Sequence, residues 1–530
     1  MDTWQSPERL QTLATIKRTT QWDMLVIGGG ITGVGIAREA ARQGLSVLLL
    51  EQKDFAWGTS SRSSKMVHGG LRYLASGNLK LTSHSVKERE RLMDEAPGLV
   101  DLMAYSWPHY KGQFPGPKVF SILLALYDRF AGQKYRHFID KQEALYELPG
   151  LSEDGLLGAT RFADAVTDDS RLVMRVLNEA YNDGAISLNY CQVDEMQYQN
   201  DRVSGVIATD QVTGERYEIS ANVVVSATGA WADKFRKQLG QEGKIRPLRG
   251  SHLMIPAWRL PCAQSITLKH PVDGRSMFIY PWEGLTVIGT TDLDHPEVDS
   301  TEPSIQPAEV DYLLKAANHL FPKSNLEKTD IVATFAGVRP IVSGGALNPS
   351  SEKRDHSIWD DKGLITVSGG KLTTFRLIAL DVLKAASVYF KQLNYKDLGQ
   401  RIFNDAKASS QQFALLETQW QRRLLGFYGQ QIDDVCECAQ EEGWALVPGT
   451  MTYWAQVRFA ARSEFVVNLD DLLLRRTRIG LCVGEGGRAF EEKIKHICQQ
   501  ELQWDDAQWQ QQWQNYLAVW QRYYSLPESA

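Results

Sequence analysis

The hydrophobic and polar positions of residues 23–51 follow the order of a strand, a helix and a second strand. Residues 24–27 form a short apolar run, as in a buried strand of a parallel sheet. Apolar residues then recur at helical spacing over residues 36–41, and a second apolar run ends at Glu51. Because two parallel strands joined by a helix are the unit of α/β folds, we predict that an α/β domain begins here.

Further along the chain, the pattern predicts two kinds of sheet. Residues 186–207 and 214–219 are typical of a meander inserted in the first domain, and residues 223–229 of a buried parallel strand that ends in a small-residue turn. Over residues 246–292 apolar and polar positions alternate, which favours an antiparallel sheet in a second domain. Residues 364–367 predict a further strand, followed by a double glycine and a helix to about residue 389.

Residues 119–130 place their apolar side chains on one arc of a helix, with Ser121, Ala125, Asp128 and Arg129 opposite. Such a helix usually packs onto its own core. The alternative is an interfacial helix that dips into anionic lipid.

From about residue 394 onward, the composition shifts to Gln, Glu and Trp in long helical stretches such as residues 453–477 and 503–524. In the last stretch, large side chains share one helical face: Trp509, Trp513, Tyr516, Leu517, Trp520 and Tyr524. We expect a stripe of core residues, with membrane-surface contact or dimerisation as alternatives.

Composition narrows the class of protein. The net charge of −6 over 530 residues gives no reason to expect a nucleic-acid partner. Six cysteines form neither a disulfide framework nor a zinc spacing, so we expect free thiols in a reducing compartment and no metal site. There is no apolar stretch of a secretory signal, and no apolar run approaches the ~18–20 residues of a spanning helix. We expect a protein that is soluble or lies on a membrane without crossing it.

The turn after the first strand carries Gly28, Gly30 and Gly33 in G-x-G-x-x-G spacing. In this pattern the first glycine allows the tight turn, the second lets a pyrophosphate approach the backbone, and the third lets helix and strand pack closely. Glu51, at the end of the second strand, suits the ribose hydroxyls of an adenosine and disfavours NADP. The motif predicts a dinucleotide and leaves FAD and NAD open.

Three later segments carry candidate chemistry. The polar run at residues 58–65 is either a surface turn or a continuation of the nucleotide cradle that delivers His68, Arg72 and Tyr73 to the reactive end of the cofactor. Arg339 stands between glycine and proline after a strand, which favours a positioned ligand contact. Lys371 lies near a helix start, where it supplies positive charge.

Ten segments occur in one order: VIGGGITGVGIA, SSKMVHGGLRYL, DAVTDDSRLV, ATGAW, RGSHLMIP, IGTTD, FAGVRPI, KRDHSI, SGGKLTT and RRTRIGL. Together they resemble the FAD-dependent glycerol-3-phosphate dehydrogenases, from about residue 20 to 390 and weakly beyond. The turn ATGAW departs from the frequent ATGPW, and residues 343–351 form a neutral, small loop.

The resemblance implies an FAD-binding Rossmann-like domain of the glutathione-reductase/D-amino-acid-oxidase type, an antiparallel-sheet substrate domain and an all-α C-terminal domain. The domains expected are an N-terminal extension (residues 1–20), a first FAD-binding part (21–100), a substrate domain (101–390) interleaved with FAD-binding segments (about 160–245 and 355–390), and a helical domain (391–530).

The resemblance also implies a reaction and its partners. Noncovalent FAD would oxidise sn-glycerol 3-phosphate to dihydroxyacetone phosphate, and electrons would pass to ubiquinone or menaquinone. The protein would lie peripherally on the anionic, cytoplasmic face of a bacterial inner membrane, or otherwise in the cytoplasm; a homodimer stays open. The alternatives are an oxidase that uses O₂, an amine or amino-acid oxidase on the same scaffold, and a non-enzymatic flavin-binding protein.

The chemistry assigns roles to particular side chains. A neutral imidazole can accept the alcohol proton, and the sequence leaves His68 and His252 open as the base. Forked guanidinium groups suit the phosphate, and Lys371 suits the negative charge that a flavin gains. The expected catalytic residues are His68, His252, Arg339 and Lys371, and the expected substrate-binding residues are Arg72, Tyr73, Thr291, Arg339 and Arg354. The expected FAD contacts are Gly28, Gly30, Thr32, Gly33, Glu51, Gln52, Thr59, Ser60, Ser64, Met66, His68, Val193, Thr228, Gly229, Trp231, Gly370, Lys371, Leu372 and Thr373.

Overall fold

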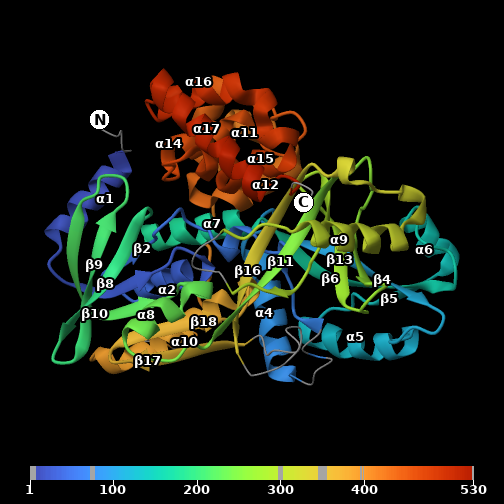
Figure 1. Ribbon diagram of the computed structural model, residues 1–530, viewed down its shortest axis with the longest axis horizontal. Coiled ribbons are helices and arrows are strands. Elements are labelled where there is room, and N and C mark those ends of the chain that lie inside the picture. Colours follow the sequence, from blue (N-terminus) through green and yellow to red (C-terminus); the bar gives the residue numbers. More distant parts are fainter. Residues whose placement is uncertain are drawn as a thin grey trace.

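The computed structural model describes residues 7–71, 74, 78–296, 302–343, 355–393, 395, 397 and 399–527. Two sheets lie side by side, and a group of C-terminal helices lies above both of them in the view of Figure 1. Arg72, Tyr73 and Arg354, expected at the substrate, lie outside the described residues.

The first sheet is the predicted parallel one. Its strands run in the order β17 (His356–Asp361), β18 (Leu364–Gly369), β10 (Arg216–Ser226), β1 (Trp22–Ile27), β2 (Val47–Leu50) and β7 (Ile186–Leu188). All neighbours in this order are parallel except β17 and β18. The βαβ unit read from the sequence thus lies in the middle of the sheet, and strands from far along the chain complete it.

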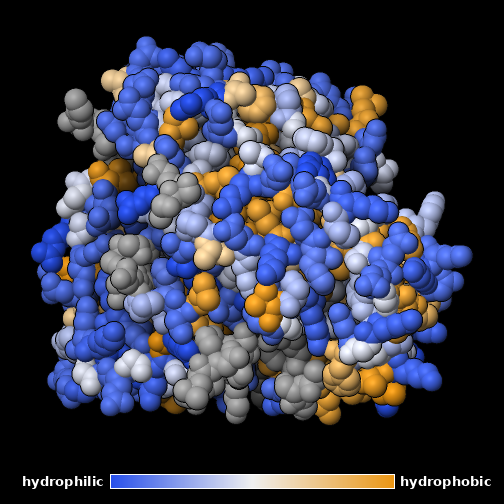
Figure 2. Space-filling view, turned by 45° about the vertical axis from the view of Figure 1, so that its right-hand side comes forward, coloured by the Kyte–Doolittle hydropathy of each residue, from blue (hydrophilic) through white to orange (hydrophobic). Residues whose placement is uncertain are grey.

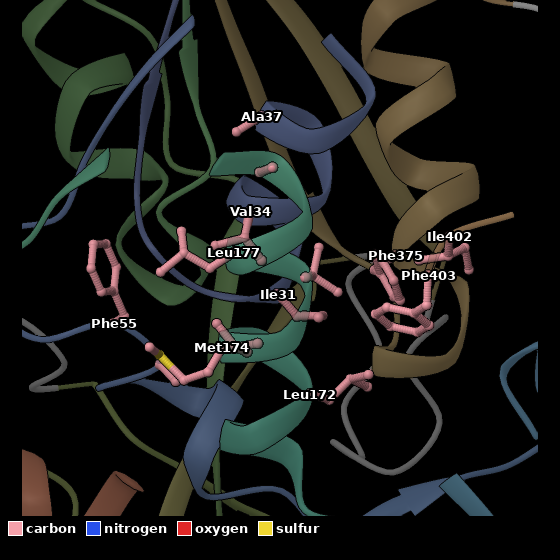
Figure 3. Close-up of a cluster of buried hydrophobic side chains, with 14 of the residues drawn as sticks. Ile31, Val34, Ala37, Phe55, Leu172, Met174, Leu177, Phe375, Ile402 and Phe403 are labelled. Carbon is pink, nitrogen blue, oxygen red and sulfur yellow. The ribbon is translucent and has the colours of Figure 1, made fainter. Parts of the chain in front are cut away.

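Three helices cover one face of this sheet: α2 (Ile31–Arg42), α7 (Asp169–Asn182) and α10 (Phe375–Ala386). Figure 3 shows their apolar side chains interlocked, with Val34 of α2, Leu177 of α7 and Phe375 of α10 meeting in one cluster. Burying such side chains contributes roughly 1.5–3 kcal/mol each. The cluster therefore fixes α2, whose first turn faces the predicted nucleotide, against the sheet.

The predicted meander is an antiparallel set of β8 (Cys191–Gln199), β9 (Arg202–Asp210) and the first half of β10. The second half of β10 continues into the parallel sheet beside β1. Leu13 and Ile16 of α1 (Pro7–Arg18) and Phe235 of α8 (Asp233–Gln238) pack in the core on this side.

The second sheet is mostly antiparallel, as the alternating pattern predicts. Its strands are β15 (Leu293–Asp294), β11 (Ile245–Pro256), β14 (Leu285–Gly289), β13 (Ser276–Trp282), β12 (Ser265–Lys269), β4 (Val100–Tyr110), β6 (Leu156–Thr167) and β3 (Met66–Val67), with β16 (Ala333–Val342) on β11 and β5 (His137–Asp140) on β6. The helices between these strands are α4 (Leu79–Glu95), α5 (Pro117–Ala131), α6 (Lys141–Glu147) and α9 (Pro307–Leu320).

The helix predicted over residues 119–130 is α5, but its faces differ from the prediction. Phe120, Leu124 and Tyr127 are buried, while Ile122 is 72% exposed. Asp128, expected on the polar side, is buried because it pairs with Arg136 at 2.6 Å. An apolar side chain is thus left on the outer face of the helix.

The C-terminal part is helical, as expected, but residues 453–477 do not form one helix. They divide into α14 (Trp454–Ser463) and a π-helical turn at Asp471–Arg476. The carboxylate of Asp471 accepts the amide hydrogens of Val467 and Asn468 and ties the intervening loop to the turn. The remaining helices are α11 (Gln411–Ala414), α12 (Thr418–Tyr428), α13 (Ile432–Glu442), α15 (Ile479–Cys482), α16 (Glu491–Glu501) and α17 (Asp506–Tyr523).

The aromatic stripe of α17 is a core stripe. Trp509, Trp513 and Tyr516 are at most 4% exposed, as is Tyr524 just beyond the helix. These rings are therefore not available to a membrane. Among the described residues, no helix combines the length and the hydropathy that crossing a bilayer requires.

Candidate active site

The glycine turn after β1 leaves no room for side chains. Gly28 has φ +112°, and a Cβ there would lie 2.7 Å from the Ala227 carbonyl oxygen of the neighbouring strand. A Cβ on Gly33 would lie 1.9 Å from the Gly28 carbonyl oxygen. Gly33 therefore lets the first turn of α2 close onto the loop, and the helix N-terminus and its amides face the space above β1.

Glu51 at the end of β2 is held in place by two backbone amides. Gly29 N donates to Oε2 at 2.6 Å, and Lys53 N donates to Oε1 at 2.8 Å. Burial raises the pKa of Glu51, and the same amides oppose that rise. The carboxylate of Glu51 is thus fixed beside the glycine turn, where we predicted from the sequence that it would bind the ribose hydroxyls.

The polar run after β2 folds back over the glycine turn. Ile31 N, at the start of α2, donates to Ser60 Oγ at 3.0 Å. A Cβ on Gly30 would lie 3.1 Å from the same oxygen. Residues 58–60 therefore line the pocket and are not a free surface turn, while the delivery of His68, Arg72 and Tyr73 to the cofactor stays a prediction.

A pocket is lined by this cradle and by residues at the ends of β1, β10 and β18, with about 1190 Å³ of free space counted with its open mouth. Most predicted cofactor contacts line it: Gly28, Gly30, Thr32, Glu51, Gln52, Thr59, Ser60, Val193, Thr228, Gly229, Trp231, Gly370, Lys371 and Leu372. These residues come from segments more than 300 residues apart in the sequence, from Gly28 to Leu372, and the fold brings them around one pocket.

Five predicted contacts lie outside the lining. Gly33 acts through packing. Met66, only 7% exposed, belongs to the core beneath the second sheet. Thr373 accepts a hydrogen bond from His68 N at 3.1 Å and donates to His68 O at 3.2 Å. This pair ties the segment that carries His68 to the turn after Lys371, so both lie close behind the pocket. Ser64 is the fifth.

Ser64 instead meets the second candidate base. Ser64 Oγ lies 2.9 Å from His252 Nε2, and the imidazole is stacked on Phe335 with ring centroids 4.4 Å apart. His252 Nδ1 is buried and has no hydrogen-bond partner among the described residues. Burial, and then the charges of Arg339 and Lys65, hold the pKa of His252 well below its usual value. His252 is therefore a neutral imidazole at pH 7.

Arg339 is prepositioned on β16. Its Nη1 donates to Asp292 Oδ1 at 2.8 Å, and its Nη2 donates to Thr290 Oγ1 at 3.1 Å. A Cβ on Gly250 of β11, two residues beyond Leu248, which pairs with Arg339, would lie 2.5 Å from Nη2. Glycine at 250 thus lets the guanidinium cross the strand, and 22% of the side chain remains exposed to a ligand.

Thr291 and Lys371 are also held by neighbours. Thr291 Oγ1 donates to Glu309 Oε1 at 2.6 Å and accepts from Ser251 N at 2.9 Å. Its predicted substrate contact could use only the remaining lone pair. Lys371 Nζ donates to Ser85 Oγ of α4 at 3.1 Å, which directs the amine from the pocket wall toward α4.

Comparison with known proteins places this geometry in a family. The family model of the FAD-dependent oxidoreductases matches residues 23–379, and the model of the C-terminal domain of alpha-glycerophosphate oxidase matches residues 396–509. An aerobic glycerol-3-phosphate dehydrogenase of Staphylococcus haemolyticus is 34% identical over 86% of this chain and 86% of its own length. The chain belongs to the FAD-dependent oxidoreductases that include the aerobic glycerol-3-phosphate dehydrogenases.

Other members of this family are similarly close. The aerobic glycerol-3-phosphate dehydrogenase of Staphylococcus aureus (strain USA300) is 33% identical over 87% of both chains. The solved structure of the glycerol-3-phosphate dehydrogenase of Bacillus halodurans, complexed with FAD, is 27% identical and covers 97% of this chain and 98% of its own, with a TM-score of 0.77. The resemblance read from the motifs, the fold class and FAD as cofactor are thereby confirmed.

The pocket of this flavoenzyme fits FAD. Gly28 and Gly30 leave the backbone open to a pyrophosphate, Glu51 is held beside them where an adenosine ribose would lie, and Lys371 and Leu372 belong to the same lining. The lining also includes residues that were not predicted from the sequence, among them Trp57, Lys234, Phe235 and Pro340. Pro340 could have been predicted from the sequence, because it directly follows the predicted Arg339. Trp57 could not, because its ring lies near that of Trp231, with centroids 5.8 Å apart, only in the folded chain.

Proposed function

We propose that this protein oxidises sn-glycerol 3-phosphate to dihydroxyacetone phosphate with FAD and passes the electrons to a membrane quinone. The observation that carries the proposal is the guanidinium of Arg339, which is held by Asp292 and precedes Pro340 in the pocket lining. In addition, relatives named as aerobic glycerol-3-phosphate dehydrogenases match 86–87% of this chain. When bound, FAD supplies the acceptor for a hydride from the alcohol carbon.

Arg339 would bind the substrate phosphate. Asp292 and Thr290 hold its fork, so little side-chain entropy is lost when two parallel hydrogen bonds form to an anion. Charge-assisted bonds of this kind contribute about 1.5–3 kcal/mol each. An alcohol without a phosphate should therefore bind far more weakly.

We assign the proton acceptor to His68. His252 is a poor candidate because Arg339 and Lys65 would repel the positive charge that it gains with a proton. The segment of His68 is fixed to Thr373 by two hydrogen bonds, just after the pocket residues Lys371 and Leu372. His68→Gln should slow substrate oxidation over the whole pH range, while His252→Gln should leave its pH dependence in place.

The deciding experiment is an anaerobic titration of the purified holoenzyme with sn-glycerol 3-phosphate, followed by flavin absorbance. Stoichiometric bleaching supports the proposal. Glycerol tests the need for phosphate, and glycine tests the amine-oxidase alternative. A flavin that stays oxidised with glycerol 3-phosphate but bleaches with glycine overturns the proposal. Rates of reoxidation by a soluble quinone and by O₂ then separate a dehydrogenase from an oxidase.

We also propose that α5 attaches the protein to the cytoplasmic face of a bacterial inner membrane. Phe114 and Ile122 are 71% and 72% exposed, Val119 is 43% exposed, and basic residues such as Lys118 flank them. Figure 2 shows apolar side chains gathered low on this face of the molecule. Apolar side chains beside lysines suit an anionic lipid surface. Co-flotation of the protein with anionic vesicles, against neutral ones, tests the attachment.

A further inference from the structure

Three arginines near the π-helical turn of the C-terminal domain reach into the FAD-binding part. Arg475, Arg476 and Arg478 belong to the RRTRIGL segment, and each is at most 4% exposed. Burying a guanidinium is costly unless it is paired and hydrogen-bonded. The partners of these three groups therefore show what the segment is built to hold.

Arg478 grips the start of α7 and the loop after β2. Its Nε donates to Asp168 Oδ2 at 3.0 Å, and its Nη2 donates to Asp168 Oδ1 at 2.9 Å and to Asp169 Oδ1 at 2.5 Å. Its Nη1 donates to the carbonyl oxygen of Ser61 at 3.2 Å. Ser61 directly follows Ser60, which lines the FAD pocket. One side chain of the C-terminal domain thus touches the backbone of the cradle.

Asp169 extends this grip along the same loop. Its Oδ2 accepts from Ser63 N at 2.9 Å and from Ser63 Oγ at 2.7 Å. Its Oδ1 accepts from Lys65 Nζ at 2.9 Å, and the same ammonium donates to Ser61 O at 2.7 Å. Ser63 is itself a lining residue of the pocket. The loop at residues 61–65 is therefore held from behind by a fully buried carboxylate that Arg478 neutralises.

Arg475 and Arg476 hold a second stretch of the cradle. Arg476 donates to both oxygens of Asp54 at 2.7 Å, and Arg475 Nε donates to Asp54 Oδ2 at 2.5 Å. Asp54 is completely buried and follows Glu51 by three residues. Its carbonyl oxygen accepts from the amide of Trp57, another lining residue, at 3.0 Å.

A third contact comes from the end of α17. The guanidinium of Arg62 lies over the rings of Trp57 and Tyr524, 5.1 Å and 5.4 Å from their centroids. Arg62 lies inside the loop that Arg478 and Asp169 hold. The C-terminal domain thus contacts residues 54–65 at Asp54, Ser61 and Arg62, and other residues of the same loop line the FAD pocket: Trp57, Gly58, Thr59, Ser60 and Ser63.

We propose that Arg475, Arg476 and Arg478 are positioning residues for FAD: the C-terminal domain holds the loop at residues 54–65 in its FAD-binding shape. They touch the loop and not the pocket, so they act through Asp54, Asp169 and Ser61. Since coupling between two sites is reciprocal, FAD should in turn stabilise the segment that carries the arginines. The proposal concerns cofactor binding and is independent of which substrate is oxidised.

The first test compares two buried arginines of the C-terminal domain. Arg478→Gln removes the grip on the loop. Arg458→Gln is the matched control, because Arg458 is 3% exposed and its partners, such as Glu442 and Gln500, lie in the same domain. We expect flavin-fluorescence titration of the apoproteins to show the FAD Kd raised about 10- to 100-fold by Arg478→Gln, and by less than about 3-fold by Arg458→Gln. Equal effects of the two variants would mean that Arg478 only supports the fold, and would overturn the proposal.

A second test needs no substitution, so it applies even where Arg478→Gln fails to fold. Hydrogen exchange is measured on the full chain with and without FAD. We expect FAD to slow exchange of amides in residues 471–482 by about tenfold or more, and to leave α13, which contacts other C-terminal helices, nearly unchanged. Exchange of residues 471–482 that does not respond to FAD would refute the coupling.

Discussion

Replacing Gly33 by alanine should weaken FAD binding by displacing the first turn of α2. The added Cβ would lie 1.9 Å from the carbonyl oxygen of Gly28, whereas real Cβ contacts essentially never fall below 3.0 Å. The gap between helix and loop must therefore widen by at least 1.1 Å. The position of a Cβ is set by its own backbone, and its neighbour is a backbone carbonyl oxygen, so no side-chain rotation relieves the clash.

The cost follows from the hydrogen bonds that the helix offers to a pyrophosphate. A shift of this size breaks or stretches one or two charge-assisted bonds worth about 1.5–3 kcal/mol each. We expect a loss of about 2–4 kcal/mol, which corresponds to an FAD Kd raised roughly 30- to 1000-fold. Overpacking should also lower the free energy of unfolding of the apoprotein by about 1–3 kcal/mol.

The measurement is an FAD titration of deflavinated protein, with urea unfolding of the same samples. Gly35→Ala, two residues further into α2, is the control, because its Cβ would meet Cδ2 of the Phe375 side chain at 2.8 Å and a ring can yield. Its Kd should stay within about 3-fold of the unchanged protein. If Gly33→Ala binds FAD as tightly as Gly35→Ala, the close approach at Gly33 does not shape the cradle, and the reasoning fails.

Three further outcomes are expected. Arg339→Ala should raise KM for glycerol 3-phosphate by about 100-fold or more, because the forked contact with the phosphate is lost. Arg339→Lys should raise KM less, because the ammonium still neutralises Asp292. Steady-state kinetics that give the same KM for both variants would count against this role. Changing both Phe114 and Ile122 to serine should weaken binding to anionic vesicles about tenfold or more. Turnover with a soluble electron acceptor should persist. An unchanged flotation profile would exclude α5 as the site of membrane attachment. Two carboxylates raise the pKa of His356 to about 9, so its ion pairs stabilise the folded state fully below pH 6.5 and lose this effect as the pH rises through 9. Because those carboxylates are largely exposed, we expect His356→Gln to cost about 1 kcal/mol at pH 6 and close to nothing at pH 10; urea unfolding that gives the same difference at both pH values would refute the assignment.

The features predicted best from the sequence are those encoded by residues that are consecutive in the chain. Strand, glycines, helix, strand and Glu51 are consecutive, so the cradle could be read from one stretch, and Lys371 could be read from the strand and double glycine before it. Trp57 and Phe235 carry no comparable local signal. They reach the pocket only because β1, β2 and β10 pair across some 200 residues.

The errors have local physical causes. Residues 453–477 were predicted as one long helical stretch, but α14 ends at Ser463 and Phe465 follows with a left-handed φ of +55°. Asp471 then accepts the amide hydrogens of Val467 and Asn468 ahead of the π-helical turn. Asp128 was placed on a polar face, yet its pairing with Arg136 lets the carboxylate be buried. In both cases a carboxylate forms a hydrogen bond or ion pair that cannot be predicted from the spacing of hydrophobic residues.

The order of strands in the parallel sheet bears on how the newly made protein matures. β18 and the turn with Leu372 complete a pocket whose first wall is β1, and Leu372 is synthesised 345 residues after Ile27. At roughly 5–20 residues per second, the ribosome needs about 20–70 s to cover that interval. For the first part of this interval, until β10 has been synthesised, β1 has β2 as a neighbour on one side and none on the other, so its second edge is exposed to chaperones and to other nascent chains. Because residues as late as Leu372 line the pocket, we expect flavin to be incorporated only after most of the polypeptide has emerged.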